Sequence, residues 1–275
     1  MIDFPIAKIN IGLQVVGKRP DGFHEISGLF YPVNLTDVLE ILPASYPSPG
    51  FFCYGPEKRA VDPEDNLIKQ AIEKLRPRKE LPEFHTALYK KIPAGSGLGG
   101  GSSNAASTIK MLNREFELGL SLKEMAEIAL DLGSDCPFFI YERPAIASGR
   151  GEELQFLESF LKDYHWVIVH SGKHISTTEA YQNIIPKSGR KDLTKLIDTP
   201  LKEWKEAATN DFEEFAFKKY PELKSIKDEL YRSGALYASM TGSGSAIFGI
   251  FESHPTLPKE GLISKATVFK GSFKE

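Results

Sequence analysis

The chain has 275 residues, and its 34 lysines and arginines against 37 aspartates and glutamates give a net charge of −3. This balance excludes a basic nucleic-acid-binding arm, and 41% hydrophobic with 26% charged residues is typical of globular proteins. Cys53 and Cys136 stand too far apart for a disulfide framework or a zinc motif. The acidic start and the short apolar runs predict neither a secretory signal nor a membrane span, so we expect a cytoplasmic protein of undefined oligomeric state.

The first predicted element is a strand over residues 6–13, where apolar residues alternate with polar ones. Because successive strand side chains point to opposite faces, Lys8 and Asn10 share one face. A turn-rich segment of glycine, proline and aspartate follows, and it leads through Phe23 and His24 into another apolar stretch. We therefore expect a loop between two strands here.

Two helices and a strand are predicted in the middle of the chain. Asp65 and Asn66 give an Asx-type start to an amphipathic helix over residues 67–75, whose apolar residues recur at helical spacing. Residues 84–89 have the pattern of a strand, and this strand runs into a glycine-rich segment. A second helix begins near Ser102, so the glycines precede a helix N-terminus.

A third helix opens with Ser121 and Glu124, which have the spacing of a capping box, and Gly133 is well placed to end it. Asp135 lies in the short loop that follows, where aspartate is also a common helix cap. Beyond about residue 155 we predict a second unit. Its expected elements are a strand over 166–170, a helix over 175–185, helices around 200–218 and 222–233, and a Gly/Ser loop that feeds a strand over 246–251.

The glycine-rich segment is the most informative part of the sequence. Residues 95–101 hold five glycines in seven positions, followed by two serines and a helix. Ordering so many glycines is entropically unfavourable. Because glycine has no Cβ atom, however, the backbone N–H groups of such a loop can approach an oxyanion closely. The helix dipole and the serine hydroxyls favour a phosphate group. The segment therefore predicts an anion site, against the alternative of a plain strand-to-helix connection.

Two familiar glycine motifs fit this segment poorly. Gly95 and Gly100 have the outer spacing of a Walker loop, but Gly101 stands where that motif requires its lysine. The spacing of Gly95, Gly97 and Gly100 also satisfies the dinucleotide-binding pattern. The following 30 residues, however, predict two helices and no second strand with a ribose-binding acid. A P-loop NTPase is disfavoured, and the dinucleotide match is weak.

Taken whole, the segment PAGSGLGGGSSNAAS resembles the phosphate loop of the GHMP kinase superfamily of small-molecule kinases. The resemblance extends through AKINIGLQVVGKRPDGFHEI, EDNLI, LGSDCPFF, ASGRGEEL and MTGSGSAIFG, which together span residues 7–249. It implies an α+β fold of two subdomains with the active site in the cleft between them. The expected division is an ATP-binding domain over residues 1–155 and a substrate-side domain over residues 156–275.

The resemblance also implies a set of nucleotide-side and catalytic residues. It predicts transfer of a phosphoryl group from ATP, with Mg²⁺ delivered by the nucleotide and no metal site in the protein itself. Asp135 is the implied catalytic carboxylate, and Lys8 the cation that contacts it and the acceptor hydroxyl. The implied nucleotide-binding residues are Pro93, Gly95, Gly97, Leu98, Gly99, Gly100, Gly101, Ser102, Ser103, Asn66, Leu67 and Lys90.

The branch of the superfamily that the motifs resemble acts on a small polyol linked to cytidine diphosphate, in the non-mevalonate route to isoprenoid precursors. By resemblance, Phe23 and Tyr181 stack on the two sides of the cytosine, and His24 hydrogen-bonds its edge. Tyr181 has an equally open reading as a core tyrosine of a short helix. The other implied acceptor-binding residues are Asn10, Thr241 and Gly242.

Other functions remain open at this stage. A kinase for homoserine, mevalonate or a sugar has no base to stack, so Phe23 and His24 argue against it. A dinucleotide-dependent oxidoreductase requires the weak glycine match to be real. A nucleotide-binding module without catalysis would bind ATP but show no turnover.

Overall fold

The computed structural model describes residues 1–44, 50–64, 66–187, 189 and 192–273. Unit 1 comprises Met1–Ala7, Leu35–Ala94 and Gly99–Glu142, and unit 2 comprises Lys8–Asn34, Gly95–Leu98 and Arg143–Glu275. Each unit is therefore built from several segments of the chain. Most of the first two long strands and part of the glycine loop belong to unit 2, and the expected functional division at residue 155 stays a prediction.

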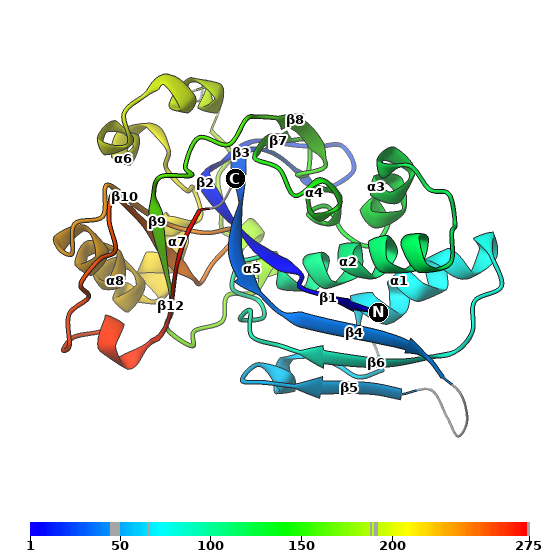
Figure 1. Cartoon of the computed structure of the whole chain (residues 1–275). Coiled ribbons are helices and arrows are strands. Elements are labelled where there is room, and N and C mark those ends of the chain that lie inside the picture. The colour runs from blue at the N-terminus through cyan, green and yellow to red at the C-terminus, as the bar shows by residue number, and fades with distance from the viewer. Residues whose placement is uncertain (45–49, 65, 188, 190–191, 274–275) are drawn as a thin grey trace. The chain divides into compact units, whose positions relative to one another are not determined.

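Unit 1 is a four-stranded sheet covered on one face by helices. Its strand order is β1-β4-β6-β5, with β5 parallel to β6 and the other pairs antiparallel. Figure 1 shows α1 and α2 along one side of this sheet. The strands are β1 (Ile2–Asp3), β4 (Val38–Pro43), β5 (Gly50–Tyr54) and β6 (Phe84–Tyr89), and the helices are α1 (Leu67–Leu75), α2 (Gly100–Glu115), α3 (Leu122–Leu130) and α4 (Cys136–Tyr141).

The helix starts of unit 1 follow the sequence signals. The Asn66 side chain accepts hydrogen bonds from the backbone of Ile68 and Lys69, which confirms the predicted cap of α1. The capping box of Ser121 and Glu124 is present at α3. This helix ends at Leu130, three residues before the expected glycine.

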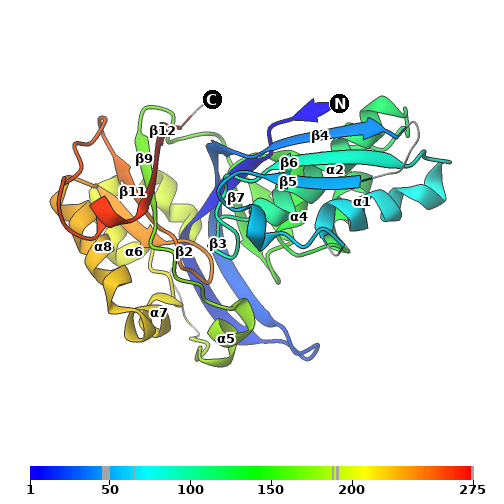
Figure 2. The same ribbon diagram turned by 90° about the horizontal axis from the view of Figure 1, so that it is seen from below.

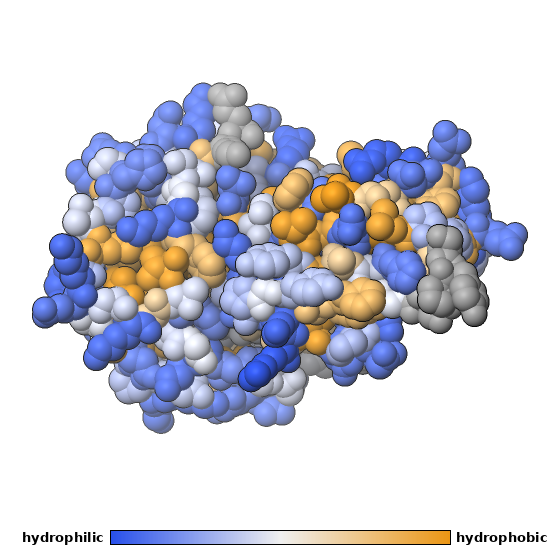
Figure 3. All heavy atoms as spheres, turned by 60° about the horizontal axis from the view of Figure 1, so that its bottom comes forward, coloured by the Kyte–Doolittle hydropathy of each residue, from blue (hydrophilic) through white to orange (hydrophobic). Residues whose placement is uncertain are grey.

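The other face of this sheet carries exposed apolar side chains. Leu42, Phe52, Tyr54 and Tyr89 are each between 43% and 54% exposed. Their alternation with buried neighbours such as Leu88 is the period of a sheet with one covered face. Figure 3, in which the side of β5 and β6 comes forward, shows apolar side chains at this surface.

Unit 2 contains two four-stranded sheets. One has the order β2-β3-β7-β8 and the other the order β10-β11-β9-β12, whose pairs are all antiparallel. The long strand β2, Ile6–Lys18, includes the predicted strand over residues 6–13. The remaining strands are β3 (His24–Thr36), β7 (Ala145–Ser148), β8 (Glu153–Phe156), β9 (His165–His170), β10 (Tyr237–Met240), β11 (Ile247–Phe251) and β12 (Thr267–Ser272).

Short helices pack on the second of these sheets, as Figure 2 shows for α8 beside β11. The helices of unit 2 are α5 (Thr177–Gln182), α6 (Trp204–Ala207), α7 (Glu213–Lys219) and α8 (Pro221–Arg232). The core of unit 2 includes Trp166, Trp204 and Tyr237, which are at most 2% exposed. The predicted helix over 175–185 is shorter at both ends. The 3₁₀ turns among the described residues are Lys58–Ala60, Arg76–Arg78, Leu193–Asp198, Leu201–Glu203 and Ile263–Lys265.

None of the helices in the described ranges is long and apolar enough to cross a membrane.

Candidate active site

A buried polar cluster on β2 forms the centre of the predicted site in unit 2. The Lys8 ammonium donates a hydrogen bond to the Asn10 side-chain oxygen at 2.6 Å, which confirms that the two residues share a face. The Thr241 hydroxyl at 3.1 Å and the Gly242 N–H at 2.8 Å donate to the same oxygen. Lys8 and Asn10 are only 2% and 1% exposed, so both polar side chains are buried.

These three donors fix the orientation of the Asn10 amide. Its oxygen is fully used, so its Nδ2 group points the other way. That nitrogen is buried and has no hydrogen-bond partner in the part of the chain that the structure describes. Because an unsatisfied buried donor is costly, it is suited to receive an oxygen atom of a ligand.

The first half of the glycine loop lies directly against this cluster. The Lys8 N–H donates to the Leu98 carbonyl at 3.0 Å, and the Ala246 N–H donates to the Ser96 carbonyl at 3.1 Å. Gly97 has a φ of +83°, and a Cβ atom there would overlap the carbonyl group of Thr241. Glycine is therefore required at this position by both the backbone conformation and the available space.

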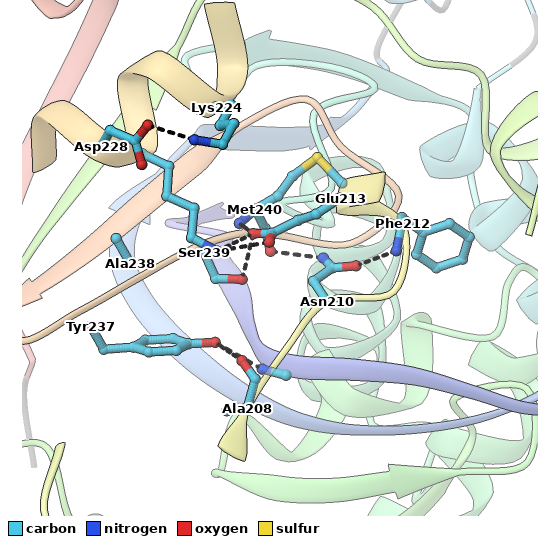
Figure 4. A network of polar contacts seen from close by, with 12 residues as sticks. Ala208, Asn210, Phe212, Glu213, Lys224, Asp228, Tyr237, Ala238, Ser239 and Met240 are labelled. Atoms are coloured by element: carbon cyan, nitrogen blue, oxygen red, sulfur yellow. Dashed lines mark hydrogen bonds and ion pairs between the residues drawn. The ribbon is translucent and has the colours of Figure 1, made fainter. Parts of the chain in front are cut away.

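Two residues from a distant segment support the turn at Thr241 from the other side. The Asn210 amide donates to the carbonyls of Met240 and Gly242 at 2.8 and 2.9 Å. Glu213 accepts from the Ser239 hydroxyl and the Met240 N–H, and it pairs with Lys227 at 2.7 Å. Figure 4 shows Asn210 and Glu213 pointing toward the end of β10. The turn is thus held by hydrogen bonds before any ligand binds.

In unit 1, the predicted catalytic carboxylate lies beside the second half of the glycine loop. The side chain of Ser102, in the first turn of α2, is hydrogen-bonded to the Cys136 thiol. Asp135 immediately precedes this cysteine and is the first residue before α4. Its side chain makes no capping hydrogen bond to that helix, which disfavours the reading of Asp135 as a simple cap. Burial raises the pKa of the Cys136 thiol to about 12.

The Ser103 hydroxyl is a second unsatisfied group at this helix start. Ser103 is 1% exposed, and its hydroxyl finds no hydrogen-bond partner among the described residues. It lies in the first turn of α2, where the helix dipole favours a negative group. A phosphate oxygen or a nucleotide-bound cation could satisfy it.

A buried carboxylate that the sequence analysis missed ties together the two ends of the glycine loop. Asp37 is fully buried and accepts from the N–H groups of Lys91 and Ile92 at 2.7 and 2.8 Å, just before the loop. The Asn104 amide, just after the loop, donates to the same carboxylate at 3.0 Å. The Lys90 ammonium is paired with Asp37 as well. Asp37 therefore fixes both ends of the loop from inside unit 1.

Lys90 and Asn66, two of the predicted nucleotide-binding residues, both lie in unit 1. The Lys90 ammonium is 3% exposed, and a Cβ atom on Gly100 would come within 2.7 Å of it. The Asn66 oxygen caps α1, and its Nδ2 donates to the Asp62 carbonyl at 3.0 Å. Both side chains thus make polar contacts within unit 1, and their predicted roles in nucleotide binding stay predictions.

Two of the three predicted base-binding residues, His24 and Tyr181, form a stacked ring group in unit 2. The His24 and Tyr181 rings are stacked with centroids 5.0 Å apart, and Tyr181 meets Phe212 edge to face at 4.8 Å. The Arg150 guanidinium lies 4.8 Å from the ring centroid of Phe23, which is 52% exposed. Partial burial, followed by the nearby charge of Lys18, lowers the pKa of His24 below its ordinary value. This favours the neutral ring, which has one donor and one acceptor.

The sequence alone gave weak signals for the supporting residues. Asp37 is an acid directly before the apolar pair Val38 and Leu39, and a buried charge needs partners. Asn210 and Glu213 lie in a helical region with no motif, about 30 residues before the turn that they hold. No group of three or more metal-ligating His, Cys, Asp or Glu side chains occurs within the described ranges.

The chain matches the N-terminal domain of the GHMP kinases over residues 66–143 and their C-terminal domain over residues 193–259. It is 41% identical to the 4-diphosphocytidyl-2-C-methyl-D-erythritol kinase of Parabacteroides distasonis, covering 98% of this chain and 99% of that protein. The enzyme of the same name from Bacteroides thetaiotaomicron is 44% identical with the same coverage.

Solved structures have the same fold. A crystal structure of 4-(cytidine 5'-diphospho)-2C-methyl-D-erythritol kinase has a TM-score of 0.80 and 30% identity, covering 99% of this chain and 98% of that one. The mevalonate kinase of Methanococcus jannaschii has a TM-score of 0.68 at 17% identity, covering 98% and 97%, and shows the fold alone.

The chain therefore belongs to the GHMP kinases, a family of ATP-using phosphotransferases, and within it to the 4-diphosphocytidyl-2-C-methyl-D-erythritol kinases. This membership confirms the predicted α+β two-domain fold.

Proposed function

We propose that the protein transfers the γ-phosphoryl group of ATP to the 2-hydroxyl of 4-diphosphocytidyl-2-C-methyl-D-erythritol, in the non-mevalonate pathway to isoprenoid precursors. The names of its relatives support this acceptor. The structural observation that carries the proposal is the Ser102–Cys136 hydrogen bond, which holds Asp135 next to the glycine-rich start of α2. We place the reaction in the cytoplasm, because Cys53 and Cys136 are both free thiols, as is usual in a reducing compartment.

The glycine loop binds the triphosphate. Its glycines leave backbone N–H groups open to phosphate oxygens, and the start of α2 adds the positive end of a helix dipole. The unsatisfied Ser103 hydroxyl suits Mg²⁺ that arrives with the nucleotide, because magnesium usually binds through few protein groups and the substrate phosphates. When bound, Mg²⁺ neutralises charge on the transferring phosphoryl group.

Asp135 and Lys8 are the proposed catalytic residues. Asp135 orients the acceptor hydroxyl and accepts its proton as the phosphoryl group leaves ATP. Lys8 supplies a positive charge to that hydroxyl, and Asn10 holds its ammonium in place at 2.6 Å. Phosphoryl transfer has a loose transition state, so positioning of the hydroxyl contributes more than early deprotonation.

The ring group binds the cytosine of the acceptor. Tyr181, already stacked on His24, offers one aromatic surface, and Phe23 offers another that the Arg150 guanidinium partly covers. The neutral His24 ring reads the polar edge of the base. The buried Asn10 Nδ2 group and the turn at Thr241 and Gly242 bind the oxygens of the polyol.

An assay with Mg·ATP and a panel of acceptors tests this function. We expect phosphorylation of 4-diphosphocytidyl-2-C-methyl-D-erythritol at least about a hundredfold faster than homoserine or mevalonate, because a site built for a base leaves polar groups unpaired without one. The Asp135→Asn variant, prepared in the same way, controls for contaminating kinases. Equal rates with the three acceptors, or no turnover of any, would overturn the proposal.

A further inference from the structure

A loop that follows β9 lies against the turn at Thr241 in unit 2. It comprises residues 171–176, between the end of β9 and the start of α5. The Ser245 hydroxyl donates a hydrogen bond to the Lys173 carbonyl. Ile175 is 1% exposed, and a Cβ atom on Gly244 would come within 3.0 Å of its side chain. The loop is therefore anchored at both Lys173 and Ile175.

Between these anchors, the imidazole ring of His174 lies on the first glycine of the phosphate loop. A Cβ atom on Gly95 would come within 2.6 Å of the ring carbon Cε1 and 2.7 Å of Nδ1. Gly95 has a φ of +62°, and the ring occupies the space that a side chain would otherwise take. His174 thus borders the Gly95 end of the loop, where phosphate oxygens approach the backbone.

The ring nitrogens of His174 are available to a ligand. The residue is exposed, and its ring makes no hydrogen bond or ion pair with the residues that the structure describes. Its neighbour Lys173 is engaged differently, because its ammonium is 3.3 Å from Glu222 and 5.5 Å from the ring centroid of Tyr220. Of these two basic residues, His174 is therefore the one whose side chain is available to a ligand at the glycine loop.

We propose that His174 binds a phosphate oxygen at the Gly95 end of the glycine loop by donating a ring N–H hydrogen bond. The proposal rests on the proposed kinase function. Two ligands of that reaction carry such oxygens, the triphosphate of ATP and the diphosphate of the acceptor. Hydrogen bonds to a charged group are stronger than neutral ones, so the contact adds affinity for one of the two.

Three variants test this contact. His174→Ala removes the donor, and His174→Lys replaces the ring N–H with an ammonium donor, which also binds phosphate. His254→Ala is the matched control, because His254 is another histidine of unit 2 whose ring packs on His165 at 3.9 Å, away from the glycine loop. For each variant, KM for ATP, KM for the acceptor, kcat and the melting temperature are measured.

We expect His174→Ala to raise one of the two KM values about tenfold, with kcat changed less than about threefold. His174→Lys should bring that KM most of the way back to the wild-type value. The KM that rises identifies which ligand supplies the oxygen. Unchanged KM values overturn the proposal. A rise in both, with a lower melting temperature and no restoration by lysine, also overturns it and assigns the ring to packing alone.

Binding of a non-hydrolysable ATP analogue and of the unreacted acceptor, measured by calorimetry, keeps this inference separate from the proposed function. If the wild-type enzyme shows no turnover, the proposed function fails. A dissociation constant that rises in His174→Ala and recovers in His174→Lys still supports the contact, and constants equal to wild type in both variants reject it.

Discussion

Asp135 is the residue on which the proposed chemistry most depends. Its neighbour Cys136 is a poor nucleophile, because burial keeps the thiol protonated with a pKa of about 12. The carboxylate precedes α4 without capping it. A catalytic role and a structural role therefore predict different results for its amide variant.

We expect Asp135→Asn to lower kcat by about 10² to 10⁴ while the free energy of unfolding changes by less than about 0.5 kcal/mol. Steady-state kinetics and urea denaturation measure the two effects. Asp131→Asn is the control, because Asp131 is a 60% exposed carboxylate nearby that pairs with Lys74 at 2.8 Å. A loss of about 1 kcal/mol in stability with normal kcat would instead identify Asp135 as a cap.

The lowered pKa of His24 gives a pH dependence to acceptor binding. Stacking of a base on the ring group further removes water from the imidazole, so the neutral form binds better than the protonated form. We expect the dissociation constant of the acceptor to rise several-fold as the pH falls from about 7.5 to about 5.5, through the range where histidine gains its proton.

Calorimetric titration at several pH values measures this effect. His24→Gln should bind the acceptor more weakly and lose most of the pH dependence, while binding of the ATP analogue stays unchanged. A wild-type affinity that rises at low pH would contradict the assignment of a neutral His24 to the base.

At the scale of the elements, the glycine loop depends on close backbone packing at Gly97. Gly97→Ala places a methyl group on the Thr241 carbonyl and strains a positive φ. Gly234→Ala has the same kind of strain, with φ of +94°, but open space around it. We expect about 1 kcal/mol of destabilisation for Gly234→Ala, and at least about 3 kcal/mol with loss of turnover for Gly97→Ala. Equal melting temperatures for the two variants would show that the packing is not needed.

The buried Asp37 network makes a second prediction for this loop. Asp37→Asn leaves the Lys90 ammonium buried without its partner, so we expect a loss of about 3 to 5 kcal/mol and a higher KM for ATP. The control is Asp3→Asn. The Asp3 carboxylate accepts a hydrogen bond from Ser107 of α2, the helix that also holds Asn104, a partner of Asp37. Asp3→Asn should cost about 1 kcal/mol and leave KM unchanged. Equal effects of the two variants on KM would contradict the role of Asp37 at the loop.

The local signals of the sequence predict individual elements well. Asn66, Ser121 and Glu124 act within four residues of the helix starts that they define, so their caps follow from spacing alone. The contacts that build the site are not local. Asn10 meets Thr241 across 231 residues, and Asp37 meets Lys90 across 53, so no periodicity or motif could pair them.

At the scale of the whole molecule, the fold does not determine which acceptor is phosphorylated. Mevalonate kinase shares the fold at 17% identity, so the architecture alone does not select an acceptor. The sequence motifs predicted the family, but not that residues 8–34 and 95–98 group with the C-terminal part of the chain. That grouping follows from long strands and from the packing of Gly97, which composition and periodicity do not reveal.

The most direct test of the central claim is a crystal structure of the protein with a non-hydrolysable ATP analogue and Mg²⁺. We predict phosphate oxygens on the backbone N–H groups of Gly99–Ser102, with the Ser103 hydroxyl engaged and the terminal phosphate on the side of Asp135. A triphosphate bound elsewhere, or a Ser103 hydroxyl still without a partner beside a bound nucleotide, would contradict the account.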